Sequence, residues 1–163
     1  MRISTRLFGT VMSVALTALL AGCAATVPMT PAPDAKLASC AEVTVRLPDE
    51  LAGGTDAMGN PNSVPLERRE TNAQATGAWG SPATVLLWCG DVPPGPSTLP
   101  CVSVNDVDWI VDESDAPRYR FTTFGRTPTV SVVVDSSRAS GSTILADLAP
   151  AVLATERTGG CAS

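Results

Sequence analysis

Cysteine spacing is the sequence feature that most constrains the fold of this chain. The 163 residues include five cysteines. Cys23 follows directly after an apolar N-terminal segment, and the other four lie between residues 40 and 161. Cysteines of an exported chain usually form disulfides, which restrict the chain to folds that bring the paired positions together. The number of cysteines that can form disulfides therefore depends on whether Cys23 is modified in another way.

The N-terminal segment has the order of parts of a bacterial export signal. Arg2 and Arg6 supply a basic start, and the apolar stretch that follows is shorter than the about 20 residues that span a membrane. Residues 20–23, Leu-Ala-Gly-Cys, match the lipobox, in which the cysteine thiol receives a diacylglyceryl group and the chain is cut just before it. We therefore expect residues 1–22 to be a lipoprotein signal peptide. Cys23 would be the lipidated residue, anchored in the cell membrane on its extracytoplasmic face. The alternative is an ordinary signal peptide with an incidental cysteine.

Four cysteines remain for pairing once Cys23 is set aside, and they allow three arrangements. Cys89 and Cys101 flank a stretch rich in glycine and proline, whereas Cys40 and Cys161 lie at the two ends of the domain. This spacing predicts one local bridge, Cys89–Cys101, and one bridge that joins the ends, Cys40–Cys161. The alternative is a Cys₄ zinc site, but the sequence has no C-x₂-C pair. We expect neither a metal nor a cofactor.

The stretch that follows the signal predicts a tether and then a single domain. Residues 23–39 include three prolines and show no apolar period, which is typical of a stiff linker. We expect this linker to hold one globular extracytoplasmic domain, residues 40–163, away from the membrane. Within the domain, residues 55–77 have few large apolar side chains and predict a long surface loop. Its charged run, Glu67–Glu70, is either a recognition spot or a solvated part of the loop.

Apolar periodicity predicts about five antiparallel strands. The expected strands cover residues 42–47, 83–89, 102–111, 118–122 and 129–134. The run 83–89 is apolar throughout, which predicts a central strand covered on both faces. Pro48 to Leu51 predicts one helical turn, because proline is favoured at the first position of a helix.

One helix is expected near the C-terminus. Residues 142–156 carry apolar side chains at helical spacing. Pro150 predicts a boundary near residue 149, because a proline inside a helix removes one hydrogen bond. The helix would cover one face of the sheet. The predicted fold class is therefore α+β: an antiparallel sheet of about five strands with a C-terminal helix packed on it and two disulfides.

Composition argues against several classes of function. The chain has no histidine, which excludes Ser-His-Asp and Cys-His catalysis and imidazole metal sites. Its formal net charge is −5, and loss of residues 1–22 with their two arginines makes it −7, so we expect no nucleic-acid binding. Acidic residues are densest between residues 106 and 115, on a predicted strand edge, which favours a solvated face. We therefore expect no enzyme activity; the alternative is catalysis by carboxylates.

Aromatic and arginine side chains supply the candidate ligand site. Tryptophans on a sheet can form a platform for a sugar or a peptide, or they can fill the core. Arg126 lies close to Phe124 in the sequence and could bind an anion or remain a surface charge. The candidate small-ligand cleft combines Trp79, Trp109, Phe124 and Arg126.

Several short motifs occur in an order that resembles a known family. They are Val45-Arg46-Leu47-Pro48 with Gly53, Ala78-Trp79-Gly80-Ser81-Pro82, Leu86 to Gly90, Val104 to Trp109, Phe121 to Pro128 and the final Cys161. Over residues 40–161 this order is similar to DUF3515, an actinobacterial lipoprotein family of unknown function. Trp88 departs from the pattern, which has a basic or polar residue there. The resemblance implies a membrane-anchored envelope protein and transfers no functional residue, because the family has no established activity.

These features together predict a lipid-anchored cell-envelope protein that acts as a non-catalytic interaction or structural module. Its expected contacts are the membrane, through Cys23, and another envelope protein. The alternative is a small-ligand-binding lipoprotein that uses the aromatic and arginine cleft.

Overall fold

The computed structural model describes residues 25–161 of the chain, so the predicted signal peptide and Cys23 lie outside the described residues. The two helices in this part are α1 (Ala38–Thr44) and α2 (Gly141–Val152). The strands are β1 (Glu50–Gly54), β2 (Val64–Arg69), β3 (Thr76–Trp79), β4 (Val85–Asp91), β5 (Cys101–Val104), β6 (Val107–Asp115), β7 (Arg118–Thr123), β8 (Arg126–Thr127), β9 (Thr129–Asp135) and β10 (Glu156–Arg157).

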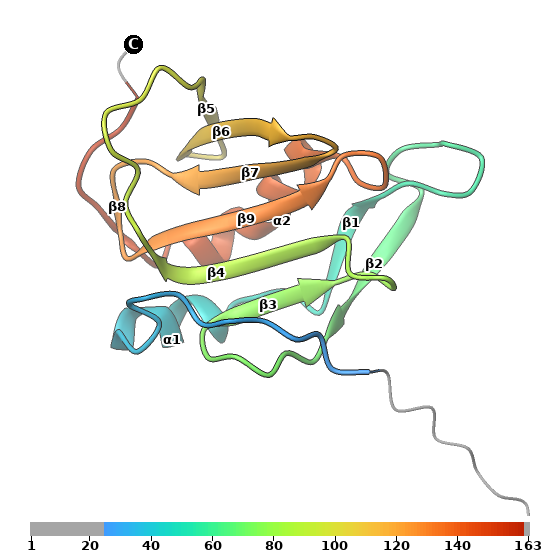
Figure 1. The fold of residues 1–163 in the computed structure, drawn as a ribbon, viewed down its shortest axis with the longest axis horizontal. Coiled ribbons are helices and arrows are strands. Elements are labelled where there is room, and N and C mark those ends of the chain that lie inside the picture. The colour runs from blue at the N-terminus through green and yellow to red at the C-terminus, as the bar shows by residue number, and fades with distance from the viewer. Residues whose placement is uncertain (1–24, 162–163) are drawn as a thin grey trace, which may run out of the picture.

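Eight of the strands form one antiparallel sheet in the order β1-β2-β3-β4-β9-β7-β6-β5, and β8 pairs with β10. The sheet curves into a half-barrel, because both of its edge strands, β1 and β5, reach the same helix, α2. Figure 1 shows α2 behind the sheet. The fold is therefore mostly β, and the predicted sheet of about five strands is too small.

The concave face of the sheet carries the core. The alternate residues of β4 and β9 that face the core are almost fully buried: Val85, Leu87, Cys89, Val130, Val132 and Val134. From the other side, α2 contributes Ile144, Leu145, Leu148 and Val152, each at most 1% exposed. This burial of apolar surface on both elements is what fixes the helix inside the half-barrel.

The strands predicted at 83–89, 118–122 and 129–134 are confirmed, as is the C-terminal helix. The run 83–89 is indeed central, since β4 lies between β3 and β9. Pro150 lies inside α2, which ends at Val152 rather than near residue 149. A proline this close to the end of a helix costs one hydrogen bond without disturbing the turns before it.

The strand predicted at 42–47 is wrong, because residues 38–44 form helix α1. Cys40 and Val43 are its buried positions, and their spacing of three fits a helix. Val45 belongs to the apparent alternation of a strand, yet its side chain is 75% exposed. The helical turn predicted at Pro48–Leu51 is also wrong, because β1 begins at Glu50 and pairs with β2.

Two other predicted segments contain more structure than expected. The loop predicted at 55–77 includes all of β2 and the start of β3, and Leu66 of β2 is buried. The strand predicted at 102–111 is a hairpin of β5 and β6. Asn105 and Asp106 form its two-residue turn, and both have positive φ, as a type I′ turn requires.

The disulfides join Cys40 to Cys89 and Cys101 to Cys161, so the predicted pairs Cys89–Cys101 and Cys40–Cys161 are wrong. Cys89 lies on the central strand β4, whereas Cys101 begins the edge strand β5. Four strand spacings separate them, about 19 Å, which no disulfide spans. The glycine- and proline-rich stretch is thus a crossover between distant strands, not a local turn.

Residues 25–37 form an N-terminal segment that lies on the sheet, where the sequence predicted a free tether. The Val27 N–H donates to the Glu70 carbonyl at 2.8 Å, and the Asp34 N–H donates to the Gly90 carbonyl at 2.9 Å. A β-carbon on Gly90 would lie 2.3 Å from the Asp34 backbone, and Gly90 has a φ of +86°. Glycine at this position therefore permits both the bend of β4 and the close passage of the segment.

Candidate functional site

The predicted ligand residues do not form a common cleft. Trp79 and Trp109 are both 0% exposed and belong to the core on the concave face. The Trp79 indole N–H donates to the Pro48 carbonyl at 2.9 Å, which satisfies its only polar group. Both tryptophans therefore stabilise the fold, and the prediction that they bind a ligand is wrong.

Arg126 is also part of the fold rather than of a surface site. Its side chain is 8% exposed and donates to the Thr155 carbonyl at 3.0 Å and to the Asp106 carbonyl at 2.9 Å. Burial lowers the pKa of Arg126 from its ordinary value, and the nearby charge of Arg157 lowers it further. Because both of its contacts are backbone carbonyls, Arg126 joins the β5–β6 hairpin to the end of α2.

Phe124 is the one predicted ligand residue that lines a surface cavity. This cavity, the proline-loop groove, lies between the loop Val92–Pro100 and the outer face of the sheet and has a volume of about 630 Å³. Its lining is Pro94, Gly95, Pro96, Ser97, Leu99, Cys101, Ile110, Phe124, Gly160 and Cys161. Most of these side chains are apolar, and the volume lies within the range of small-molecule sites.

Contacts within the chain fix both sides of this groove. On one side the Pro100 carbonyl accepts from the Val111 N–H at 2.9 Å, which joins the end of the loop to β6. On the other side the disulfide Cys101–Cys161 joins the C-terminal segment to β5. The groove is therefore a fixed feature of the fold, although its lining comes from four separate parts of the sequence.

Asp108 strengthens the C-terminal side of the groove. Its carboxylate accepts from the Ser103 hydroxyl and from the Cys161 N–H, and it lies 3.8 Å from the Arg157 guanidinium. The hydrogen bond from Ser103 is the main cause that lowers the pKa of Asp108, and the Cys161 N–H and Arg157 lower it further. The acidic stretch that the sequence assigned to a solvated face thus includes one carboxylate with a structural role.

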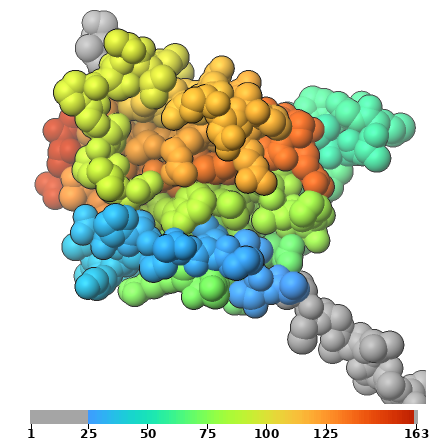
Figure 2. Space-filling view, in the orientation of Figure 1, coloured from blue at the N-terminus to red at the C-terminus, as the bar shows by residue number. Residues whose placement is uncertain are grey.

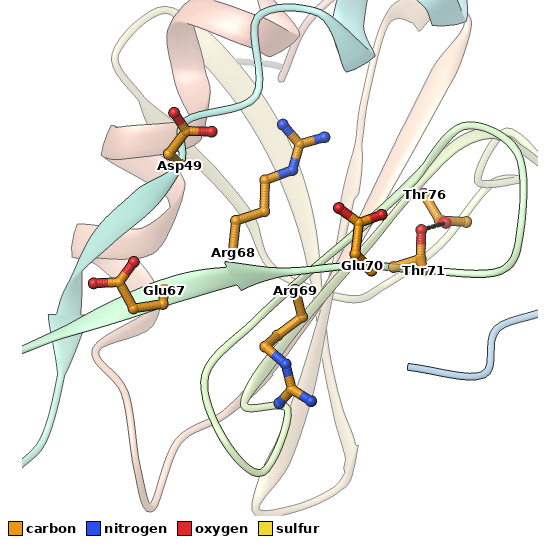
Figure 3. A pocket seen from close by; sticks show the side chains of 7 residues that line it. All are labelled: Asp49, Glu67, Arg68, Arg69, Glu70, Thr71 and Thr76. Carbon is orange, nitrogen blue, oxygen red and sulfur yellow. Dashed lines mark hydrogen bonds between the residues drawn. The ribbon is translucent and has the colours of Figure 1, made fainter. Parts of the chain in front are cut away.

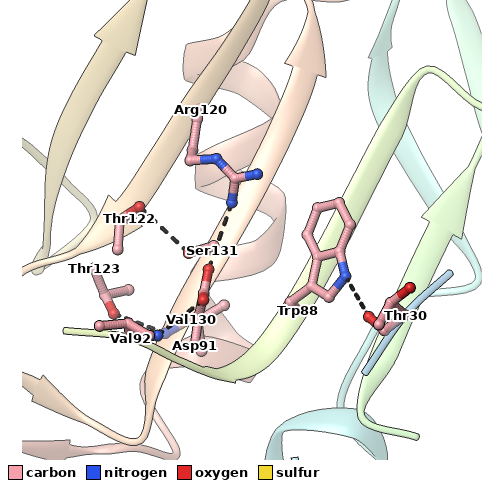
Figure 4. Close-up of polar contacts among 9 residues, drawn as sticks. All are labelled: Thr30, Trp88, Asp91, Val92, Arg120, Thr122, Thr123, Val130 and Ser131. Carbon is pink, nitrogen blue, oxygen red and sulfur yellow. Dashed lines mark hydrogen bonds and ion pairs between the residues drawn. The ribbon is translucent and has the colours of Figure 1, made fainter. Parts of the chain in front are cut away.

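The convex face of the sheet exposes a tryptophan that the predicted site omitted. Trp88 is half-buried; its indole N–H donates to the Thr30 carbonyl at 3.1 Å, and the Arg120 guanidinium lies 5.5 Å from the ring centroid. Figure 4 shows Arg120 between this ring and Asp91, to which it pairs at 3.5 Å. Alternation along β4 is the signal that could have found it, because Trp88 falls between the inward positions Leu87 and Cys89.

The charged run Glu67–Glu70 lies mostly on β2 and lines a second, polar groove of about 430 Å³ together with Asp49, Thr71 and Thr76. Figure 3 shows that Arg68 and Arg69 point to opposite sides of the strand. Arg68 donates to the Leu47 carbonyl at 3.3 Å, and Arg69 donates to the carbonyls of Gly80 and Ala25 at 3.0 and 2.6 Å. Both arginines are therefore engaged by backbone, and the groove has three carboxylates beside them.

Metal-binding clusters and membrane-spanning helices are both absent from residues 25–161. No group of three or more His, Cys, Asp or Glu side chains there could hold a metal ion. Neither helix of this part is long and apolar enough to cross a membrane.

Comparison with known proteins identifies a family. The family model DUF3515, described as a protein of unknown function, matches residues 6–159. The chain belongs to this family. Membership in DUF3515 confirms the resemblance that the short motifs suggested, over nearly the whole sequence. No curated protein and no solved structure matches the chain.

Proposed function

We propose that this DUF3515 protein is a lipid-anchored, extracytoplasmic binding module of an actinobacterial cell envelope. The export signal that ends at Cys23 supports the anchor, and two disulfides suit a domain outside the cytoplasm. The module is non-catalytic, and it binds an extended apolar segment of another envelope protein in the proline-loop groove. The groove is the observation that carries this proposal.

Exposed apolar side chains around the groove support a protein partner. Val92 and Leu99 of the loop are 64% and 41% exposed. Apolar surface gathered beside a cavity is typical of interaction sites. β5 is also an edge strand of the sheet, and an edge strand offers backbone groups to an extended peptide. An extended segment with apolar side chains would use both features.

Site-specific photocrosslinking in membranes of the native host tests this proposal. A benzophenone side chain replaces Leu99, which lines the groove, and in a matched variant it replaces Leu153, which is similarly exposed at 45% but lies after α2. We expect a discrete protein adduct from position 99 and none from position 153. Equal adducts from both positions, or none from position 99, would contradict a protein-binding groove.

The anchor is tested separately by the variant Cys23→Ala. Mass spectrometry is expected to find a diacylglyceryl group on Cys23 of the unaltered protein, where two acyl chains give stable attachment, and an unmodified, uncleaved N-terminus in the variant. Unaltered protein without lipid on Cys23 would contradict the anchor.

The volume of the same groove favours one alternative, a small apolar ligand. About 630 Å³ is enough for a small molecule. A thermal-shift screen against apolar ligands is expected to stabilise the unaltered protein and not the variant Leu99→Arg, if this alternative holds. A screen without any stabilising compound would eliminate it.

A further inference from the structure

The N-terminal segment is attached to the sheet from its first described residue. The Ala25 carbonyl accepts from Arg69 at 2.6 Å, and the next contacts are the Val27 N–H to the Glu70 carbonyl and the Met29 N–H to the Asn72 side chain at 2.7 Å. Further along, the Thr30 carbonyl accepts from the Trp88 indole. Four contacts within six residues leave no free linker after Ala25.

The length of chain before Ala25 is correspondingly short. Cys23 precedes Ala25 by two residues, and two extended residues span at most about 7 Å. A free linker of 16 residues, as predicted for Ala24–Ser39, would have an average span of roughly 22 Å. Ala25 is exposed at the surface of the domain, so an anchor that reaches only about 7 Å from it keeps this surface close to the bilayer.

We propose that the domain lies directly on the bilayer, with the surface around Ala25 against the lipid headgroups. This surface consists of the end of β2 and the turn that follows it, Arg69–Asn72. The inference rests on the proposed lipid anchor at Cys23 and deepens it, because it assigns the face of the domain that contacts lipid.

Charge is not what holds this face to lipid. The polar groove beside it has three carboxylates and two arginines, and both arginines are engaged by backbone carbonyls. Such a surface offers little attraction for anionic headgroups. The contact therefore depends on the short connection to the anchor, and it is the same on zwitterionic and anionic bilayers.

The orientation leaves the proline-loop groove facing away from lipid. In Figures 1 and 2 the N-terminal segment (blue) runs along the lower edge of the molecule, and the loop Val92–Pro100 (yellow-green) leads away from it toward the opposite, upper edge. With Ala25 at the headgroups, the groove is open to the space above the membrane, where a protein partner can reach it.

Fluorophore quenching on vesicles tests the orientation. A single added cysteine carries the label, either Glu70→Cys near Ala25 or Ser97→Cys in the proline loop; both residues are exposed. The lipidated protein is bound to phosphatidylcholine vesicles that carry a nitroxide on the headgroup. We expect several-fold stronger quenching of the label at position 70 than at position 97, with no change when anionic lipid is added. Equal quenching at the two positions, or a difference seen only with anionic lipid, would overturn the inference.

A linker insertion provides the matched control. A flexible glycine–serine insert of about 12 residues after Ala24 adds an average span of roughly 20 Å and leaves the lipidated residue unchanged. The insert is expected to abolish the difference between the two labels; a difference that persists would contradict the role of the short connection. Protein that fails to float with the vesicles would contradict the anchor at Cys23 itself. Protein that floats with equal quenching contradicts only the orientation.

Discussion

The two faces of the sheet use the same strands for different purposes. On the concave face, β3, β4, β6 and β9 present side chains that are at most 1% exposed at many positions, among them Trp79 and Trp109. On the convex face, alternate residues of these strands include Trp88, which is half-buried beside Arg120. Burial, not residue type, therefore separates the tryptophans that hold the fold from the one that is open to solvent.

The convex face is also where distant parts of the sequence meet. The N-terminal segment crosses β4 at Gly90, and the loop Val92–Pro100 leads from β4 to β5. The C-terminal segment reaches β5 through the disulfide Cys101–Cys161. The proposed lipid contact and the proposed binding groove both include these segments. We therefore expect substitutions on the concave face to lower the free energy of unfolding, and substitutions on the convex face mainly to weaken binding.

The two disulfides give the largest expected losses of stability. Each closes a loop of about 50–60 residues, which corresponds to about 4 kcal/mol of stability in the chain-entropy model. Cys40 and Cys89 are 0% exposed, so replacing both with alanine also removes buried volume. Denaturant unfolding is expected to show a larger loss for the Cys40→Ala, Cys89→Ala protein than for the Cys101→Ala, Cys161→Ala protein. A larger loss of stability in the Cys101→Ala, Cys161→Ala protein would contradict the greater structural role given to the buried disulfide.

The tryptophans test the two faces directly. Trp109→Ala is expected to lower the free energy of unfolding by about 3–5 kcal/mol, because it leaves a cavity in the core. Trp88→Ala is expected to cost about 1–2 kcal/mol, since it removes partial burial and one cation–π contact. Urea titration followed by far-UV circular dichroism measures both. Equal losses would show that the convex face is as tightly packed as the core.

A buried and an exposed arginine, Arg126 and Arg120, provide a second comparison between buried and exposed side chains. Arg126→Met leaves two buried carbonyls without their charged donor and is expected to cost about 2–4 kcal/mol. The Arg120 side chain is 46% exposed and its ion pair with Asp91 is at the surface, so Arg120→Met is expected to cost about 1 kcal/mol or less. Thermal unfolding of the two variants compares them. A loss at Arg120 that matches the loss at Arg126 would contradict the structural role given to burial.

Asp108 gives a small effect that depends on pH. The pKa of Asp108 is lowered in the folded protein, chiefly by the Ser103 hydrogen bond. Its stabilisation is therefore present above its unfolded pKa of about 4 and is lost as the pH falls through the lower folded pKa. Asp108→Asn is expected to cost about 1 kcal/mol at neutral pH, with the difference shrinking below about pH 4. A difference that is independent of pH would contradict this titration.

Sequence periodicity predicted the strands in which apolar and polar residues alternate. β7 and β9 follow their apolar pattern, and α2 follows its helical spacing. The pattern misled at residues 42–47, where Val45 alternates by coincidence and points to solvent. β2 was missed because its single buried apolar residue, Leu66, gives no period, and its pairing with β1 and β3 is decided by tertiary structure.

The candidate site was less predictable than the fold. Chemistry selected Trp79, Trp109 and Arg126, but the two tryptophans fill the concave face and Arg126 is buried against backbone carbonyls, so their burial stabilises the protein. Phe124, chosen as an aromatic residue close to Arg126, follows β7 and does line a surface cavity. The proline-loop groove depends on the crossover from β4 to β5, and the spacing of Cys89 and Cys101 suggested a local turn there instead.

Partner capture with a groove variant tests the central claim most directly, namely that the convex face binds while the concave face holds the fold. Leu99→Arg changes an exposed side chain, so its free energy of unfolding is expected to stay within about 0.5 kcal/mol of the unaltered protein. Crosslinked partner recovered from native membranes is expected to fall several-fold for this variant and to be unchanged for Leu153→Arg. Undiminished recovery from a Leu99→Arg protein of unchanged stability would contradict the account.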